Sequence, residues 1–318
     1  MTRNLLLYAH FNKRGEVASY VLYQLEKLRQ TYDYILFISN SPIKTVDKVK
    51  LDGIVDEVIQ RENVGFDFAA WSVGLFHLGR TKVAEYENVT VMNDTCFGPI
   101  FALDLTPPLG TNSCAVSSLE TDENTSETSV WAMTDCRALK KNEYKRGHPG
   151  RDLPWHLQSY FVTFRAAALN SDRFWEFWGE RLGGKESDVQ AVIDQYEVGM
   201  SKVFADFHPR ASFATSALPS KHLPNFAIFE PTKCLENGVP FIKIKAFLYD
   251  SEPDCYTTAL PKHLVEHIER NTNYPATLIR EYFDVFDWQE QKRKNFEARE
   301  NAKLTTRIVR KLRALCVR

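Results

Sequence analysis

The 318-residue sequence lacks the long apolar runs that cross membranes, because no segment approaches the roughly 18 consecutive apolar residues of a membrane helix. The apolar run in the opening MTRNLLLYAHF has five residues, too few for the hydrophobic region of a signal peptide. The six cysteines are widely spread and none lies in a Cys-x-x-Cys pair. These absences predict a cytoplasmic protein whose thiols are reduced and mostly buried.

Two phosphate-binding signatures are also missing. After the first expected strand the chain reads HFNKRGEVAS, with a single glycine, so the glycine-rich fingerprint of dinucleotide-binding dehydrogenases is absent. The Gly-Lys-Ser/Thr of a P-loop is absent too, which argues against a phosphoryl or nucleotidyl transferase of that kind. The formal net charge of −1 gives no general attraction to nucleic acid, so no nucleic-acid partner is expected.

What the sequence does contain is typical of a packed α/β domain. Apolar residues make up 44% of the chain and charged residues 25%, so a sizeable core is expected. Strand-like segments alternate with segments of helical spacing. The expected strands span residues 4–11, 33–40, 55–62 and 87–94, and the expected helices 15–28 and 68–79. This alternation predicts a Rossmann-type, mostly parallel sheet with helices on both faces.

The second half of the chain is less regular. Further elements are expected at residues 155–169 (strand), 171–182 (helix), 187–204 (helix) and 238–247 (strand). Ser171 is the expected N-cap of the first helix, and Ser187 with Gln190 forms a capping box for the second. The simplest division is a main domain over 1–260 followed by a helical extension over 261–318.

Polar side chains follow each of the first four expected strands. Ligands of parallel sheets bind beyond the carboxyl ends of the strands, so this edge is the expected donor-binding site. The candidates are His10, Asn12, Ser39, Asn40, Asn63, Gly65, Asp67, Asn93 and Asp94.

Two of these strand ends allow alternative interpretations. Gly65 permits close approach of the backbone to a ligand, and Asn63 and Asp67 suit sugar or ribose hydroxyls. The same residues also suit a turn that caps the next helix. Asp94 ends a buried strand, where a carboxylate is costly unless it holds a metal, a sugar hydroxyl or a polar partner.

The stretch ENVGFDFAAW, followed by VMNDTCFGPI, resembles the rhamnan synthesis F family of glycosyltransferases. Members share an Asn-x-Gly-x-Asp signature before a helix and an Asn-Asp at the next strand end, followed by Phe-Gly-Pro. The segments HLQSYFVTF, FWEFW, YEVGMS and PFIKIKAF follow in the family's order. The resemblance extends from Leu5 to Phe247 and leaves the C-terminal residues unmatched.

The resemblance implies a GT-A-like fold and an inverting glycosyltransferase, with dTDP-L-rhamnose as the usual nucleotide-diphosphate donor. The acceptor would be a hydroxyl of a lipid-linked surface glycan such as an O-antigen or a rhamnan. The alternative is a non-catalytic subunit that binds a sugar nucleotide or a glycan within a polysaccharide assembly complex.

The sequence departs from the Asp-x-Asp of GT-A enzymes, since it has Asn93-Asp94-Thr95. Asp94 would hold one Mg²⁺ or Mn²⁺ with water and phosphate, or else bind sugar hydroxyls without a metal. In the second case basic side chains neutralise the diphosphate. The candidates for that role are Arg14, Lys145, Arg146 and Arg151.

The family also implies a catalytic base near the start of a late helix. Glu197 matches that position, and Asp152 is the reserve candidate. His156 and Gln158, beside Trp155, are expected to line the acceptor or donor-sugar pocket, although a structural role for the histidine is the alternative.

Two basic features complete the expected site. Lys243 and Lys245 alternate on an expected strand, so they either contact the diphosphate or form a solvated edge. Residues 289–318 carry ten Lys or Arg against three Glu, with an apolar stripe at helical spacing. This tail fits peripheral contact with the anionic inner face of the cell membrane, or packing against the domain or a second subunit.

Overall fold

The computed structural model describes residues 3–106, 128–140, 152–179, 188–217, 225–248 and 261–285. Contacts within the chain divide it into two compact units, Met1–Pro275 and Ala276–Arg318. The sheet lies in the first unit, and the described part of the second unit contains helix α12 (Thr277–Asp284). The division expected after residue 260 remains a prediction.

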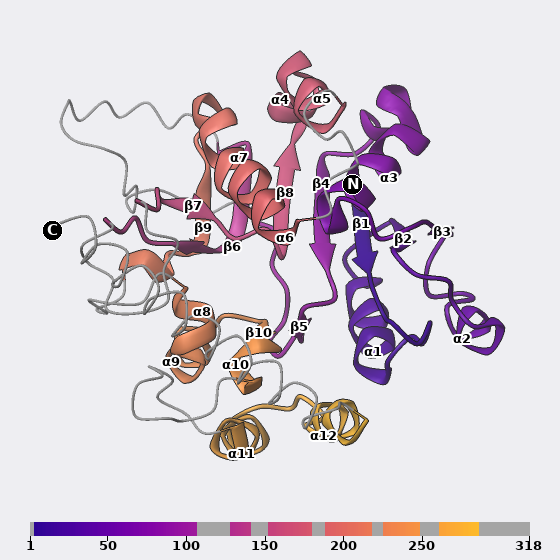
Figure 1. Ribbon diagram of the computed structural model, residues 1–318, viewed down its shortest axis with the longest axis vertical. Coiled ribbons are helices and arrows are strands. Elements are labelled where there is room, and N and C mark those ends of the chain that lie inside the picture. Colours follow the sequence, from indigo (N-terminus) through magenta and orange to yellow (C-terminus); the bar gives the residue numbers. More distant parts are fainter. Residues whose placement is uncertain are drawn as a thin grey trace, which may run out of the picture. The chain divides into compact units, whose positions relative to one another are not determined.

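An eight-stranded sheet forms the centre of the first unit, in the order β3-β2-β1-β4-β8-β6-β7 with β9 beside β6 (Figure 1). Strands β1 to β4 pair in parallel, whereas β8 is antiparallel to both β4 and β6. The strands are β1 (Asn4–His10), β2 (Tyr34–Ser39), β3 (Glu57–Gln60), β4 (Asn88–Asn93), β6 (Val130–Cys136), β7 (His156–Leu157), β8 (Phe161–Arg165) and β9 (Arg210–Phe213). The predicted α/β fold with a mostly parallel, GT-A-like sheet is confirmed.

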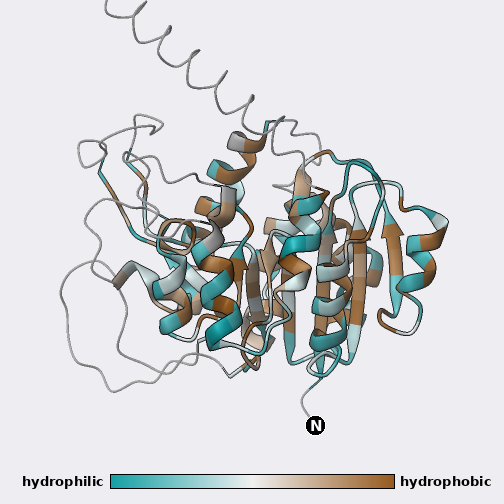
Figure 2. Cartoon of the chain, turned by 90° about the horizontal axis from the view of Figure 1, so that it is seen from below, coloured by the Kyte–Doolittle hydropathy of each residue, from teal (hydrophilic) through white to brown (hydrophobic). Residues whose placement is uncertain are grey.

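Helices cover both faces of the sheet because alternate residues of a strand point to opposite sides. Leu5 and Leu7 of β1 belong to the main core together with α3 (Phe66–Val83). Tyr8 follows Leu7 and points to the opposite face, where its hydroxyl donates to Gln24 of α1 (Ser19–Leu28) at 2.6 Å. In Figure 2 the strands of the sheet are mostly brown, as expected for strands buried on both faces.

The other helices are short. They are α2 (Thr45–Lys50), α4 (Ala166–Leu169), α5 (Asp172–Gly179), α6 (Val189–Val192), α7 (Val198–Val203), α8 (Phe226–Phe229), α9 (Pro231–Glu236), α10 (Lys245–Leu248) and α11 (Pro261–Asn271). The side chain of Ser171 accepts a hydrogen bond from the backbone N–H of Phe174 at 3.2 Å, which confirms it as the N-cap of α5. The backbone of α3 breaks at Gly79 (φ 77°), where the sequence predicts the helix to end.

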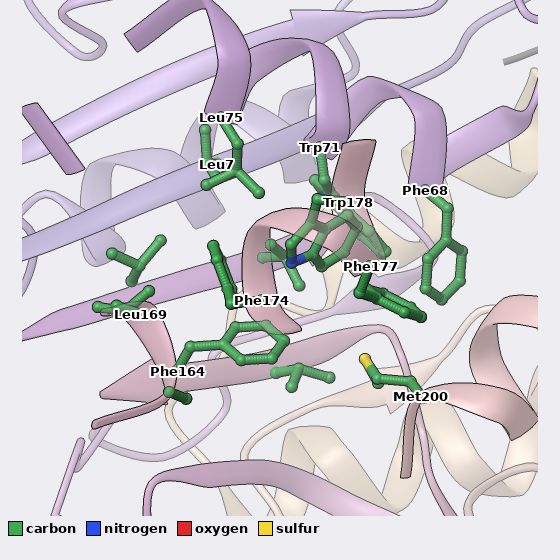
Figure 3. Close-up of a cluster of buried hydrophobic side chains, with 14 of the residues drawn as sticks. Leu7, Phe68, Trp71, Leu75, Phe164, Leu169, Phe174, Phe177, Trp178 and Met200 are labelled. Atoms are coloured by element: carbon green, nitrogen blue, oxygen red, sulfur yellow. The ribbon is translucent and has the colours of Figure 1, made fainter. Parts of the chain in front are cut away.

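An aromatic cluster fixes α3, α5 and the late helices to one face of the sheet. Phe68 and Trp71 of α3 lie against Trp178 of α5, as Figure 3 shows. The Phe68 ring also contacts Tyr196, with 5.8 Å between centroids. Phe68 and Tyr196 are the sequence neighbours of Asp67 and Glu197, so the core itself sets the spacing of two candidate site residues.

Three expectations for the second half of the chain are wrong in detail. The strand predicted over 155–169 is divided into β7 and β8, and its last four residues form helix α4. The helix predicted over 187–204 is interrupted by a π-helical turn, η2 (Ile193–Glu197), between α6 and α7. The strand predicted over 238–247 is reduced to β10 (Ile242–Lys243), which pairs with β5 (Cys96–Phe97) before the chain turns into α10. The proposed capping box lies partly outside the described residues, because Ser187 is not among them.

The described helices are all too short or too polar to cross a membrane. Cys96, Cys136 and Cys234 are buried free thiols, as predicted. The other three cysteines and the basic tail over 289–318 lie outside the described residues.

Candidate active site

The candidate site lies at the carboxyl edge of the sheet, where β1 and β4 end side by side. Asp94 follows β4, and its carboxylate oxygen Oδ2 accepts a hydrogen bond from the backbone N–H of Phe11 at 2.9 Å. His10 Nε2 lies 4.0 Å from the same oxygen. The Tyr20 hydroxyl donates to the backbone carbonyl of Asp94 at 2.7 Å. Asp94 is therefore held by the loop that follows β1.

The protonation of Asp94 is strongly affected by this environment. Burial raises the pKa of Asp94 to about 8, against the opposing effect of the Phe11 N–H, and the nearby Asp67 charge adds to the increase. Near neutral pH the neutral acid is therefore favoured, so Asp94 can donate a hydrogen bond as well as accept one.

Asp67 lies in the first turn of α3. The chain reaches this helix through two left-handed residues, Gly65 (φ 72°) and Phe66 (φ 50°). Left-handed backbone at a bulky residue is unfavourable and clusters at functional sites. The side chain of Asn93 donates from Nδ2 to Asp67 Oδ2 at 2.7 Å, and its Oδ1 accepts from both the N–H and the hydroxyl of Thr95.

This geometry requires an amide at position 93. A carboxylate in its place would face the carboxylate of Asp67 and could not donate to it. The amide nitrogen instead lowers the pKa of Asp67, which burial nevertheless raises to about 6. The Asn-x-Gly-x-Asp and Asn-Asp motifs are thus joined by a direct hydrogen bond.

Arg61 positions the first of these motifs, and the sequence analysis missed it. Its guanidinium donates to the backbone carbonyl of Val64 at 2.6 Å and to Asn40 Oδ1 at 2.5 Å, and reaches the carbonyl of Phe66 at 3.5 Å. It therefore ties the end of β2 to the strained turn before Asp67. A planar group with several donors suits this role better than lysine.

We expect Arg61→Lys to weaken donor binding about tenfold, because a single ammonium cannot reproduce three contacts in a fixed geometry. The measurement is the affinity for a nucleotide sugar, with Arg29→Lys, an exposed arginine paired with Asp56, as the matched control. Unchanged affinity in Arg61→Lys would show that the turn before Asp67 keeps its conformation without the guanidinium contacts of Arg61.

Glu197 ends the π-helical turn η2, and turns of this kind are frequent at functional sites. Its Oε1 accepts a hydrogen bond from the backbone N–H of Ser159 at 3.1 Å. Burial is the main cause of the raised pKa of Asp67, and the charge of Glu197 adds to the increase. The two carboxylates therefore lie in one region. Asp67, Asp94 and Glu197 are thus brought together from three separate parts of the chain.

Two lysines complete this region. Lys243 lies on β10 opposite Cys96, and its ammonium sits 4.6 Å from the ring centroid of Tyr160. Lys245, at the first position of α10, has its pKa lowered by desolvation and by Lys243, whereas Glu197 and Asp67 oppose that decrease. Both lysines also lower the pKa of Asp67. Although the predicted strand ends early, the turn at residue 244 keeps both charges near the carboxylates.

Several predicted donor-binding residues have structural partners. Ser39 donates to the carbonyl of Ser41 at 2.8 Å and lies 3.0 Å from His10 Nδ1. Burial lowers the pKa of His10 to about 4, so the ring is neutral at physiological pH. Asn12 accepts from the backbone N–H of Arg14 and forms a tight turn. Asn40 is buried and bound to Arg61, and Asn63 is half-buried beside Gly65.

The residues expected in the sugar pocket also have partners within the protein. Trp155 donates from its indole nitrogen to Asp135 at 2.8 Å. Gln158 is fully buried against Thr134 and Cys136. His156 is buried, with Nδ1 2.9 Å from the carbonyl of Pro154. These contacts favour structural roles for Gln158 and His156.

The remaining candidates are either exposed on the surface or outside the described residues. Asp152 is exposed, next to the bridge between residues 139 and 153. Arg14 is exposed and paired with Glu16 at 3.1 Å. Arg151, Lys145 and Arg146 lie outside the described residues.

Whether a divalent metal ion fits this site depends on the side chains available to coordinate it. Within the described ranges, no group of three or more His, Cys, Asp and Glu side chains converges as a metal cage would require. Asn93 is committed to Asp67 and Thr95. Mg²⁺ or Mn²⁺ at Asp94 would therefore draw most of its ligands from water and the donor's diphosphate.

The first unit is therefore an α/β domain with a mostly parallel, Rossmann-type sheet, and its candidate site lies at the carboxyl edge of that sheet. The sequence profile described as Rhamnan synthesis protein F matches residues 35–312, and the chain belongs to that family. The predicted family is thereby confirmed.

Individual relatives are distant. The chain is 25% identical over 194 residues to Uncharacterized protein y4gN of Sinorhizobium fredii, covering 61% of this chain and 44% of that protein. It is 25% identical over 150 residues to Virulence protein VirA of Vibrio anguillarum, covering 47% and 39% respectively. The chain thus spans less than half the length of these curated relatives. Among solved structures, the WbbM bifunctional glycosyltransferase has a TM-score of 0.41 and 12% identity, covering 88% of this chain and 51% of that chain, a likeness too distant to inform on activity.

Proposed function

We propose that the protein is an inverting glycosyltransferase that moves L-rhamnose from dTDP-L-rhamnose to a hydroxyl of a lipid-linked surface glycan. The observation that carries this proposal is the convergence of Asp67, Asp94 and Glu197 with two lysines at the carboxyl edge of the sheet. Family membership supports the reaction class, and the rhamnose donor rests on the family description.

In this reaction Glu197 accepts the proton of the acceptor hydroxyl. The acceptor oxygen forms a bond to the anomeric carbon on the face opposite the diphosphate. The bond between the anomeric carbon and the diphosphate oxygen breaks, and its electron pair leaves with the nucleotide. A carboxylate held by the Ser159 N–H and flanked by a buried tyrosine has the fixed geometry that a general base needs.

The leaving diphosphate gains negative charge as its bond to the sugar breaks. Lys243 and Lys245 are both coupled to the Asp67 carboxylate, and Arg61, which is coupled to it as well, is already bound to Asn40 and Val64. The two lysines are therefore the groups we assign to that charge. Asp67 and Asp94 are assigned to hydroxyls of the donor, Asp94 as a hydrogen-bond donor near neutral pH. A metal at Asp94, when bound, would add positive charge beside the diphosphate.

The double variant Lys243→Met/Lys245→Met tests this assignment. We expect it to reduce release of dTDP from dTDP-β-L-rhamnose about a hundredfold, because removal of one preorganised partner of a developing charge typically reduces rates by this factor or more. Methionine keeps an unbranched apolar side chain at each position and removes the charge, including the ammonium that lies over Tyr160. The control is Lys233→Met. Lys233 belongs to α9, and its ammonium lies over the ring of Phe226 in α8.

The alternative function is a non-catalytic subunit that binds a sugar nucleotide or glycan. It is favoured by the absence of the first aspartate of Asp-x-Asp, whose place Asn93 takes. It predicts saturable binding of the dTDP-sugar with no release of dTDP in the presence of any acceptor. Turnover by the wild type that the lysine substitutions abolish would exclude this alternative.

A further inference from the structure

Helix α2 presents an apolar face to solvent. Val46 and Val49 are 67% and 62% exposed, the highest values among the exposed large hydrophobic residues described. They are three positions apart, so they lie on the same face of the helix. On the opposite side Asp47 is buried and pairs with Lys50 at 2.7 Å.

Basic residues flank these two valines in the sequence, and two of them are ion-paired, Lys44 with Glu16 and Lys50 with Asp47, each at 2.7 Å. The backbone N–H of Lys44 donates to the carbonyl of Gly15 at 2.8 Å, so the loop before α2 is joined to the loop after β1. Across residues 11–16 and 41–50 there are five Lys or Arg against two acidic residues, although the whole chain carries a net charge of −1. We call Lys13, Lys44, Val46, Lys48, Val49 and Lys50 the basic rim.

The basic rim is continuous with the edge of the sheet that holds the candidate site. The loop after β1 contains Phe11, which is 38% exposed and whose backbone N–H holds Asp94. The loop before α2 begins at the end of β2, beside Ser39 and Ser41. A surface that binds the basic rim would therefore lie close to the candidate site.

We propose that the basic rim docks on an anionic lipid bilayer. Exposed valines among exposed lysines suit the headgroup region, because the valines enter the apolar boundary while the lysine ammonium groups reach the lipid phosphates. A protein partner fits less well, since lysine is depleted at the cores of protein interfaces and a six-residue helix offers a small area. Docking would bring the site to a lipid-linked acceptor, and this consequence rests on the proposed function. The docking itself does not depend on that function.

The test is co-flotation of the full chain with vesicles of phosphatidylcholine, with and without about one third phosphatidylglycerol as the anionic lipid. The wild type should float with the anionic vesicles and dissociate at high salt. Val46→Asp/Val49→Asp should bind at least tenfold more weakly. Val73→Asp, at an exposed valine of α3, should bind as the wild type does.

Wild-type flotation of the Val46/Val49 variant would overturn the proposal and assign any membrane binding to another surface such as the basic tail. Equal flotation of the wild type with neutral and anionic vesicles would overturn it as well. Because both valines are exposed, an unchanged unfolding midpoint is expected and shows that the variant is folded. Release of dTDP by the variant without vesicles should match the wild type, so failure of docking and failure of the proposed function are separable.

Discussion

Glu197→Gln is expected to lower the rate of sugar transfer by two to four orders of magnitude, roughly the contribution of a general base. Glutamine has the same shape and still accepts the hydrogen bond that the Ser159 N–H donates at 3.1 Å. What it cannot do is take the acceptor's proton. We therefore expect the loss in kcat, with donor affinity close to that of the wild type.

The measurement is the initial rate of dTDP release at saturating donor, together with donor affinity by calorimetry. Glu176→Gln, an exposed glutamate on α5, is the matched control and should be unaffected. Asp152→Asn is the informative comparison, because Asp152 is the reserve candidate for the base. A large loss in Asp152→Asn with full activity in Glu197→Gln would reverse the assignment.

The second large effect concerns stability and pH. The pKa of Asp94 is about 8 in the folded protein and 3.8 for an ordinary aspartate. The folded state therefore binds more protons than the unfolded state between these values, and stability falls as pH rises through this range. Below about pH 4 the acid is neutral in both states and the full stability is present.

Asp94→Asn removes this penalty, because asparagine is neutral at every pH and its Oδ1 can accept from the Phe11 N–H. At about 1.4 kcal/mol per pKa unit, the variant is expected to gain a few kcal/mol of unfolding free energy at pH 9 over the wild type, and little at pH 4. A stabilised variant that loses activity is the usual result of removing a strained functional group.

Denaturant unfolding across this pH range measures the effect. Asp104→Asn is the control, since hydrogen bonds to Thr106 lower the pKa of that exposed carboxyl and the sign of its small effect is opposite. Parallel pH profiles for wild type and Asp94→Asn would show that Asp94 is already charged in the folded state.

The sheet and its functional edge were predictable from the sequence because they depend on local patterns. The apolar runs of β1, β2 and β4 are nearly continuous, which is what burial on both faces requires. Parallel strands place their carboxyl ends at one edge, so the sequence by itself predicts that His10, Asp67 and Asp94 lie near one another.

The features that the sequence did not predict correctly depend on contacts between distant segments of the chain. The alternating pattern of FIKIKAF fits a long strand, yet β10 has only the two residues of β5 to pair with. The hydrogen bond from Asn93 to Asp67 spans 26 positions, and no local pattern encodes it. The contacts of Arg61 with the turn were only weakly indicated by the sequence, through an arginine two residues before the Asn-x-Gly-x-Asp motif.

The central claim is that this edge of the sheet binds an activated sugar between the carboxylates and the two lysines. Isothermal titration calorimetry with dTDP-β-L-rhamnose, with and without Mn²⁺, tests it most directly. We predict one binding site per chain, with affinity at least tenfold lower in Lys243→Met/Lys245→Met and unchanged in Lys233→Met. Absence of binding to dTDP-, UDP- and GDP-sugars alike, or equal affinity in all three proteins, would contradict the claim.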